Sequence, residues 1–452
     1  MISHQFGIWA DAIVITSLPQ DAWKYFAAPF PAPSFTFAQE LCSGLHVCTA
    51  SSQTPQPSGP LALESSHFVP TIRHTVYECL PGAYAGGVQK MVFELASAQR
   101  RLGEDVEVWT VDAGRAGKTE VHGALPIRYF SPDYALGYVR SRELNEALST
   151  LPRDALVHAH STFHPLNHDI AVVARRLGLR HFFHPHGALD PVLFVGWSLK
   201  SLKKRLYHRF VGRPDLAAAT GVFALTPLEA GQLAELGVSG RVHVVPNGIE
   251  PAPLASPEAA AAFRTTHRIG RRARVLLFVG RIMPKKRLED IISAFATLRV
   301  DMPDLVLAIA GNVAQDAAYH QRLLDLAADL GCAEAIRWLG FLDEKAKPAA
   351  FAAAEAFVHA SESEGMALAI LEAMVAGLPV VATRGCYMRL AAQAEALIEC
   401  AQGPGPLADS LRSLLSDPAC AARLRANARA HVLQEHAWDK IARRMREAYA
   451  RS

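Results

Sequence analysis

The sequence predicts an α/β protein built from two doubly wound parallel sheets in series. Short apolar stretches alternate with longer stretches that have the periodicity of helices. Because strands of parallel sheets are buried on both faces, this alternation predicts strand–helix–strand units. The pattern lapses around residues 250–272, where prolines and alanines gather, and then resumes more regularly. Two such sheets enclose a cleft, and their ligands bind at the carboxyl ends of strands.

The expected elements follow from this alternation. In the first half we expect strands over residues 75–79, 106–111, 155–160 and 242–245, with helices over residues 88–101 and 169–177. In the second half we expect strands over residues 275–279, 305–309, 336–339, 356–360 and 379–383, with helices between them. The proline-containing boundary separates a first domain of residues 71–255 from a second domain of residues 256–436. A last helix over residues 437–452 is expected to cross back to the first domain.

Length and composition narrow the class of protein. The 452 residues are roughly two to three times an ordinary domain, so two domains with extra segments are expected. Hydrophobic residues make up 50% and charged residues 20%, as in globular proteins with a large core. A net charge of +3 does not favour a nucleic-acid partner. The 7 cysteines include no Cys-x-x-Cys, which favours a reducing compartment over a disulfide scaffold or a zinc site.

Residues 1–70 form a Pro- and Ser-rich extension with the composition of a loop or a disordered segment, and we assign it no function. No stretch of the chain approaches the ~18–20 apolar residues of a membrane span. The apolar residues 6–18 are interrupted by Asp11 and lack a basic leader, which argues against a secretory signal. We therefore expect a cytoplasmic protein, and peripheral contact with the inner face of the membrane stays open.

The strongest local signal lies at residues 361–372, after an expected strand and across the start of an apolar helix. Unpaired N–H groups at that start would attract a phosphate, and a glycine there lets an anion approach closely. These groups belong to Gly365, Met366, Ala367 and Leu368. Alternatively, Glu362 or Glu364 only caps the helix. Glu372 lies within an apolar stretch, where a carboxylate needs a partner such as a ribose diol.

Cations follow the expected strand 275–279. Arg281 and Lys286 lie just past its end, where their side chains would point into the cleft. Arginine offers phosphate a bidentate fork and lysine a mobile charge, so together they could neutralise a leaving diphosphate. A solvated basic loop is the alternative.

Two weaker signals lie in the first half. Gly86 and Gly87 open a helix and could cradle a phosphate, although no G-x-G-x-x-G is present and a tight turn fits as well. Histidines gather at strand ends, and a structural hydrogen bond is the common role of such residues. We expect function only for His186, as a donor to a sugar hydroxyl. Spacing alone does not establish a metal site.

A cluster of basic residues lies on one expected helix. It comprises Lys200, Lys203, Lys204, Arg205, His208, Arg209 and Arg213. A solvated helix face is the first interpretation. Contact with an anionic acceptor or a membrane surface is the alternative.

Together these segments resemble the family-4 retaining glycosyltransferases of the GT-B fold, also called glycosyl transferases group 1. The resemblance extends from about residue 71 to the C-terminus and depends on the order and spacing of its motifs. Glu364 and Glu372 match the E-x7-E motif, and Arg281 with Lys286 the phosphate pair. Residues 246–249 resemble the P-N-G signature and residues 371–380 the E-A-M…G-x-P-V-V stretch. Residues 186–191 resemble the histidine loop of members that build exopolysaccharide or lipopolysaccharide.

The resemblance implies two Rossmann-like domains facing across a cleft, the first binding the acceptor and the second the nucleotide sugar. It also implies a retaining, metal-independent transfer from a UDP- or GDP-linked sugar to a saccharide or lipid-linked acceptor, without a cofactor. The chain contains no Asp-x-Asp, as expected for such an enzyme. By the same resemblance, Arg281, Lys286 and Gly87 hold the diphosphate, Glu372 binds the ribose, Glu364 contacts the donor sugar, His186 reaches a hydroxyl near the anomeric carbon, and Phe341 and Leu342 flank the base.

The sequence departs from the family pattern at two places. Arg287 stands where glycine is usual, and residues 384–389 lack the usual Pro-Glu. Two other functions stay open. A nucleotide-sugar 2-epimerase shares the fold and needs no acceptor, whereas a non-catalytic GT-B subunit would keep the cleft without turnover. The intact set of Arg281, Lys286 and the two glutamates argues against the second.

Overall fold

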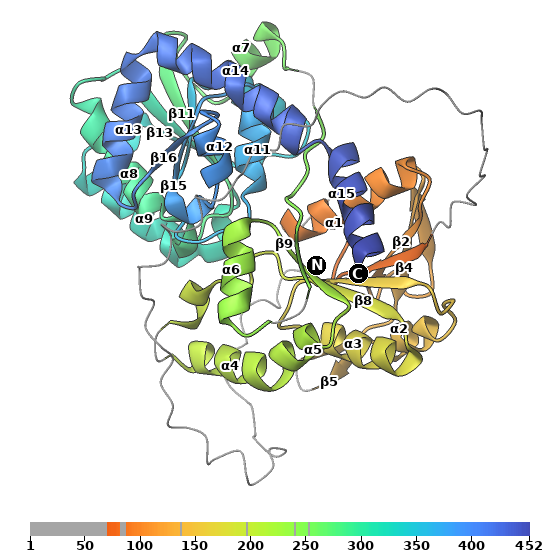
Figure 1. The fold of residues 1–452 in the computed structure, drawn as a ribbon. Coiled ribbons are helices and arrows are strands. Elements are labelled where there is room, and N and C mark those ends of the chain that lie inside the picture. Colours follow the sequence, from red (N-terminus) through yellow and green to blue (C-terminus); the bar gives the residue numbers. More distant parts are fainter. Residues whose placement is uncertain (1–69, 82–86, 136–137, 196–197, 239–240, 252–253) are drawn as a thin grey trace, which may run out of the picture. The chain divides into compact units, whose positions relative to one another are not determined.

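The computed structural model describes residues 70–81, 87–135, 138–195, 198–238, 241–251 and 254–452, which belong to one compact unit (Figure 1). The extension of residues 1–69 and the segment 82–86, which includes Gly86, lie outside the described residues. Two large sheets follow one another along the chain, and their strands are parallel with one exception. The predicted α/β class, with two parallel sheets in series, is confirmed.

The first sheet has eight strands in the order β10-β9-β8-β7-β1-β2-β4-β3, and only β3 runs antiparallel to its neighbour. Its strands are β1 Thr71–Thr75, β2 Asp105–Val111, β3 Thr119–His122, β4 Leu125–Phe130, β7 Leu156–His160, β8 Arg180–His184, β9 Gly221–Ala224 and β10 Val242–Val244. The short strands β5 Asp133–Ala135 and β6 Tyr138–Arg140 pair separately. The winding reverses between β1 and β7, because β2 lies on one side of β1 and the later strands lie on the other.

The first strand lies four residues before the predicted one. We expected a strand over residues 75–79, but β1 spans Thr71–Thr75. The prediction followed the apolar residues and overlooked a strand that carries Arg73 and His74. Both side chains are buried. Arg73 forms a hydrogen bond with Asp105, and His74 forms one with Gln99. Polar side chains whose hydrogen bonds are formed can thus be buried in a central strand with little loss of folding free energy.

The second sheet has six parallel strands in the order β13-β12-β11-β14-β15-β16. They are β11 Arg274–Val279, β12 Leu305–Ala310, β13 Ile336–Gly340, β14 Ala356–His359, β15 Val380–Thr383 and β16 Ile398–Cys400. Leu276 and Phe278 of β11 pack into one hydrophobic cluster, whereas Val275 and Leu277 pack into another. Alternate side chains of this strand therefore enter cores on opposite faces, as in a doubly wound sheet.

Helices cover both faces of the two sheets. They are α1 Gly87–Arg101, α2 Arg142–Leu148, α3 Pro165–Leu177, α4 Leu199–Tyr207, α5 Arg213–Ala217, α6 Pro227–Glu235, α7 Pro257–Thr266, α8 Leu288–Arg299, α9 Ala317–Asp329, α10 Lys347–Ala353, α11 Leu368–Val375, α12 Arg389–Gln393, α13 Pro404–Ser416, α14 Pro418–Glu435 and α15 Trp438–Arg451. Helix α3 begins four residues before its predicted start, with Pro165 at the first helical position, where proline is favoured.

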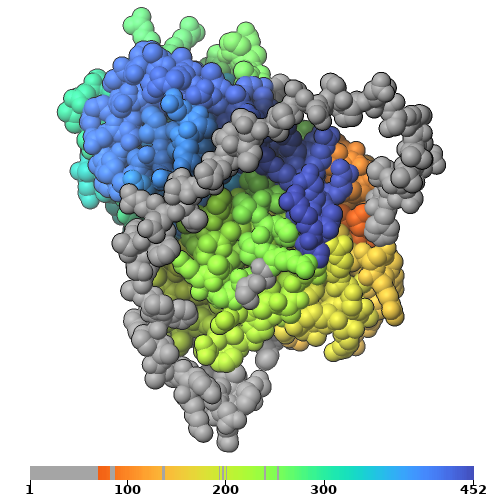
Figure 2. Space-filling model, in the orientation of Figure 1, coloured from red at the N-terminus to blue at the C-terminus, as the bar shows by residue number. Residues whose placement is uncertain are grey.

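The C-terminal helix α15 packs against α1 and the first sheet. Trp438 and Tyr449 of α15 belong to the same hydrophobic cluster as Ile72 of β1. A Cβ on Gly248 would lie 2.3 Å from the Trp438 ring, so only glycine fits at this position of the P-N-G segment. Figure 2 shows the dark blue surface of this helix beside the orange surface of the first elements. The chain end is therefore built into the first core.

Candidate functional site

The second sheet positions the predicted cation loop beside the predicted glutamate loop. Its winding reverses between the paired strands β11 and β14, since the chain first runs outward through β12 and β13. Ligands of open α/β sheets bind at such a reversal, beyond the carboxyl ends of the strands. The loop after β14 touches the loop after β11 there, since the Glu362 N–H donates to the Lys285 carbonyl at 3.0 Å. The structure thus brings the two predicted loops together.

Lys286 and Glu364 form a buried ion pair between these loops. The Lys286 ammonium donates to Glu364 Oε1, the Ser361 hydroxyl donates to the same oxygen, and His359 Nε2 lies 3.5 Å away. Burial alone would raise the pKa of the Glu364 carboxyl. The charge of Lys286 and the nearby His359 outweigh burial and lower this pKa. Glu364 is therefore ionised at neutral pH and holds the lysine in place.

Arg281 is exposed at the start of the same loop. Within the described part of the chain, its guanidinium has no hydrogen-bond or ion-pair partner. Lys286 and Arg281 thus differ: the first is held by a carboxylate, and the second is free to bind an anion.

Helix α11 begins at Leu368, three residues after the predicted start. The N–H groups of Gly365 and Met366 therefore belong to the preceding loop, whereas those of Leu368 and the two residues after it lie in the first helical turn. Glycine is needed at position 365 because the backbone of the histidine loop, and not only an anion, approaches it closely. A Cβ there would lie 2.7 Å from the His186 carbonyl oxygen, so the backbone of the histidine loop occupies this space.

The histidine loop follows β8 and packs on the glutamate loop. His186 and Gly187 both have left-handed backbones, with φ of 56° and 73°. Glu229, near the start of α6, accepts hydrogen bonds from the N–H groups of Gly187 at 2.7 Å and Leu225 at 2.6 Å. Burial raises the pKa of Glu229 to about 7, and these two hydrogen bonds oppose that rise. The sequence analysis missed Glu229, although Thr226-x-x-Glu229 is a capping-box pattern, and the Glu229 N–H does bond to Thr226 Oγ1 at 3.1 Å.

His186 is half-buried and its Nε2 lies 3.0 Å from Nδ1 of His160. Burial lowers the pKa of His186 to about 3, so the ring is neutral at physiological pH. His186 is thus a neutral polar group at the carboxyl edge of the first sheet.

Asp190 links the two halves of the site. It is buried, and its Oδ2 accepts hydrogen bonds from Ser363 and from Tyr387, the latter at 2.5 Å. Tyr387 lies in the segment that lacks the family's Pro-Glu, and it has a left-handed backbone with φ of 56°. This departure from the family pattern therefore supplies a contact to the histidine loop. Tyr387 was not among the site residues predicted from the sequence.

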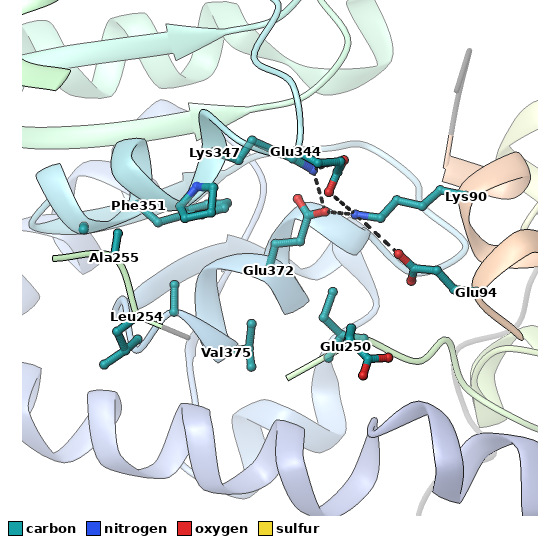
Figure 3. A pocket seen from close by; sticks show the side chains of 14 residues that line it. Lys90, Glu94, Glu250, Leu254, Ala255, Glu344, Lys347, Phe351, Glu372 and Val375 are labelled. Carbon is teal, nitrogen blue, oxygen red and sulfur yellow. Dashed lines mark hydrogen bonds and ion pairs between the residues drawn. The ribbon is translucent and has the colours of Figure 1, made fainter. Parts of the chain in front are cut away.

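Glu372 faces a pocket of about 280 Å³ lined by α1, the linker after β10, α10 and α11 (Figure 3). Its carboxylate lies 2.5 Å from the ammonium of Lys90 and 2.7 Å from that of Lys347. Lys90 also contacts Glu344 at 2.9 Å. The predicted need for a partner is met here by two lysines, neither of which the sequence analysis singled out. The half-buried position of Glu372 therefore does not by itself require a ribose.

The remaining predicted residues lie along the same edges. Gly87 is the first residue of α1, and a Cβ on it would lie 3.5 Å from Leu368, so the starts of α1 and α11 adjoin. Phe341 follows β13 and is 71% exposed, whereas Leu342 is half-buried. Neither has a contact that tests its predicted place beside a base.

The basic helix α4 carries exposed apolar residues beside its cations. Leu199 is 85% exposed, and Phe210, just after the helix, is 46% exposed. His208 differs from the other members of the cluster, because it is buried and burial lowers its pKa. Among the described residues, no helix is long and apolar enough to cross a membrane.

Comparison with known proteins gives a consistent result over both halves. A family model for glycosyl transferases group 1 matches residues 260–431, and a model for the glycosyl transferase 4-like domain matches residues 86–248. D-inositol 3-phosphate glycosyltransferase of Thermobispora bispora is 27% identical over 392 residues, which cover 81% of this chain and 90% of that protein.

Two solved structures share the fold. Sucrose-phosphate synthase of Thermosynechococcus elongatus has a TM-score of 0.69 and 21% identity, covering 84% of this chain and 98% of that one. Anabaena HepE in complex with UDP and glucose has a TM-score of 0.65 and 20% identity, covering 84% of this chain and 100% of that one.

Proposed function

Because this chain belongs to the glycosyl transferases group 1 and has the GT-B fold, we propose that it transfers a sugar from a nucleotide diphosphate sugar to a saccharide, lipid-linked or cyclitol acceptor. The complex of Anabaena HepE with UDP and glucose supports a UDP-linked donor, and a GDP-linked donor is the alternative. We further propose that the reaction retains the anomeric configuration and needs neither a metal nor a cofactor, in a cytoplasmic enzyme of cell-surface polysaccharide synthesis.

One observation carries this proposal: the loop after β11 and the loop after β14 meet at the winding reversal of the second sheet. They bring an exposed guanidinium, Arg281, and a buried ammonium, Lys286, to the same edge. The start of α11 adds backbone N–H groups and its positive dipole end. Such a set of preorganised positive groups stabilises the charge that develops on a departing diphosphate.

The roles of the remaining residues complete the proposal. Glu364 orients Lys286 and contacts the donor sugar, and His186 reaches a sugar hydroxyl from the first sheet. Glu372 binds the ribose. One of its two lysine partners, Lys90 or Lys347, would then move away or share the carboxylate with the ribose. Phe341 and Leu342 flank the base, and Gly87 lets the diphosphate approach the start of α1.

The acceptor is the least constrained part of the proposal. The name of the Thermobispora relative favours an inositol phosphate, whereas the histidine loop favours a saccharide or lipid-linked saccharide. The cations and exposed apolar residues of α4 would suit an anionic acceptor or an anionic membrane surface.

The test is release of nucleoside diphosphate by the full chain, measured with a panel of UDP- and GDP-sugars and with inositol 3-phosphate, oligosaccharides or lipid-linked sugars as acceptors. We expect acceptor-dependent release with at least one pair. Epimerised sugar in the absence of an acceptor would instead identify a 2-epimerase. Binding of the nucleotide without either product would identify a non-catalytic subunit.

A further inference from the structure

Buried histidines line the carboxyl edge of the first sheet, and the proposed transfer uses none of them directly. His74 lies on β1, His158 and His160 on β7, and His184 on β8. These strands adjoin the point where the winding of the sheet reverses, which is where such sheets bind ligands. All four rings are buried.

Two of these histidines connect His186 to a buried amide through consecutive hydrogen bonds. Gln99 Oε1 lies 2.7 Å from Nε2 of His74. Nδ1 of His74 lies 2.8 Å from Nε2 of His160, and Nδ1 of His160 lies 3.0 Å from Nε2 of His186. Both nitrogens of His74 and of His160 are therefore used within this chain of residues, which we call the histidine relay: Gln99, His74, His160 and His186.

The relay has a direction, because a neutral imidazole carries one donor and one acceptor nitrogen. Burial lowers the pKa of His74 to about 4 and that of His160 well below its usual range, so both rings are neutral. The amide oxygen of Gln99 can only accept, so His74 carries its proton on Nε2 and accepts on Nδ1. His160 then donates from Nε2, and His186 must donate its own Nε2–H to His160.

The orientation of the Gln99 amide follows from its other neighbour. Glu104 is 3% exposed, and burial raises the pKa of its carboxyl to about 7. Arg446 and the Gln99 amide oppose that rise. In the structure the Gln99 oxygen faces His74, and the carboxylate of Glu104, which attracts the NH2 group of the amide, favours the same orientation.

Ring nitrogens of His160, His184 and His186 lie within 4.8 Å of one another, a spacing that could hold a metal ion, but the two bonded nitrogen pairs of the relay are closer than ligands of one ion. Nitrogens bound to one tetrahedral zinc at ~2.0–2.1 Å stand roughly 3.3 Å apart. The ring nitrogens of His74 and His160, and of His160 and His186, are closer than that, at 2.8 Å and 3.0 Å. Direct hydrogen bonds account for both distances.

We propose that Gln99, His74 and His160 are positioning residues that hold His186 as the neutral Nε2–H tautomer and so leave its Nδ1 as a hydrogen-bond acceptor for a hydroxyl of the bound sugar. Nδ1 of His186 has no partner among the described residues, and the side chain is half-buried at the edge of the sheet. His186 thereby accepts a hydrogen bond, where the sequence suggested that it donates one. The assignment of a sugar hydroxyl as the partner of Nδ1 rests on the proposed function, whereas the assignment of the His186 tautomer does not.

The experiment is nitrogen-15 NMR of the full chain labelled at histidine, which distinguishes the Nδ1–H tautomer, the Nε2–H tautomer and imidazolium. In the wild type at pH 7.5, we expect Nε2–H for His74, His160 and His186. In Gln99→Leu, which removes the acceptor, we expect His186 to become a mixture of tautomers. The turnover number should fall about tenfold, while KM for the donor changes less than twofold.

Two matched variants separate this role from a structural one. The exchange Gln99→Glu with Glu104→Gln keeps one carboxylate and one amide, so it should retain the tautomers and at least half of the turnover. His158→Phe removes a buried histidine that bonds to Tyr449 outside the relay, at 2.6 Å, and should leave the His186 signals unchanged.

Three results would overturn the proposal: Nδ1–H or imidazolium at His186 in the wild type, unchanged His186 signals in folded Gln99→Leu, or stoichiometric Zn²⁺ that replaces the Nε2 protons. Absence of transferase activity, with the tautomers as expected, would contradict the proposed function and leave the relay in place.

Discussion

The carboxyl edges of the two sheets differ in how they present polar groups. The edge of the second sheet holds charges, with Lys286 against Glu364 and the exposed Arg281 in the same loop as Lys286. The edge of the first sheet holds neutral imidazoles, such as His160 and His186, joined by hydrogen bonds. Both edges lie at a winding reversal, so the topology is the same and the chemistry is not.

This difference suggests a division of labour across the site. A diphosphate leaving group gains negative charge, so fixed cations on one side stabilise it. A sugar is neutral and is recognised by hydrogen bonds with defined donors and acceptors, which neutral imidazoles supply. A buried charge on the histidine side would have to be desolvated without a partner.

Removal of Lys286 should give the largest effect. Lys286→Ala leaves Glu364 as a buried carboxylate without its main partner and removes a cation from the diphosphate site. We expect steady-state release of nucleoside diphosphate to fall about 10²–10³-fold. Lys345→Ala, which removes an exposed lysine of the same sheet's loops, serves as the control and should stay within twofold. Near-normal release by the Lys286 variant would remove the charged edge from the mechanism.

Acid should weaken the histidine edge before the charged edge. The folded-state pKa values of His74 and His186 are about 4 and 3, below the unfolded value near ~6.5. As the pH falls below ~6.5, the unfolded chain takes up protons first, so each such histidine lowers the free energy of unfolding by about 1.4 kcal/mol per pH unit until its folded pKa is reached. Glu364, whose pKa is lowered on folding, stabilises the fold above ~4.3 and loses that contribution only below this pH.

Urea denaturation from pH 8 to pH 5 measures the first of these losses, that of the histidine edge. In the same titration, the free energy of unfolding of His184→Phe should depend less steeply on pH than that of the wild type, by the uptake of up to one proton on unfolding. Both ring nitrogens of His184 are buried without a partner among the described residues. A stability that is flat from pH 8 to pH 5 would mean that these imidazoles take up protons in the fold as readily as in the unfolded chain, which would contradict their lowered pKa values.

Loss of Lys90 should have a smaller effect, because Glu372 keeps Lys347 as a second partner. We expect Lys90→Met to lower the free energy of unfolding by about 1.5–3 kcal/mol, the size of one hydrogen bond to a charged group. Chemical denaturation measures it, with Lys118→Met as an exposed control expected within about 0.5 kcal/mol. An equal decrease in the free energy of unfolding of both variants would show that the contact between Lys90 of α1 and Glu372 of α11 contributes little to stability.

Arg287→Gly should have the smallest effect. Arg287 has a left-handed backbone, with φ of 51°, where the family usually has glycine. Glycine would relieve about 1–2 kcal/mol of backbone strain but would lose the ion pair with Asp290 at 3.0 Å. The free energy of unfolding should therefore change by about 1 kcal/mol or less, with donor turnover within twofold. A large loss of turnover would give the Arg287 side chain a role in the site.

The sequence was sufficient for five of the six strands of the second sheet and for the meeting of the two loops, because carboxyl ends of neighbouring parallel strands share one edge. It did not predict β3, β4 and β9 of the first sheet, β16 of the second, or β8, whose two phenylalanines stand between histidines and an arginine. The partners of the site residues were also out of reach. Lys90 and Glu372 lie 282 positions apart, and the bond between Asp190 and Tyr387 spans 197 positions. Such pairs depend on how the elements pack, which local patterns do not encode.

The most direct test is calorimetric binding of a nucleoside diphosphate and of its parent nucleoside to the wild type and to Arg281→Ala. UDP with uridine is the first pair, and GDP with guanosine the second. If the cation loop and the start of α11 share one diphosphate, the variant should bind the diphosphate at least about tenfold more weakly and the nucleoside equally well. Equal affinity of the variant and the wild type for the diphosphate would contradict the account.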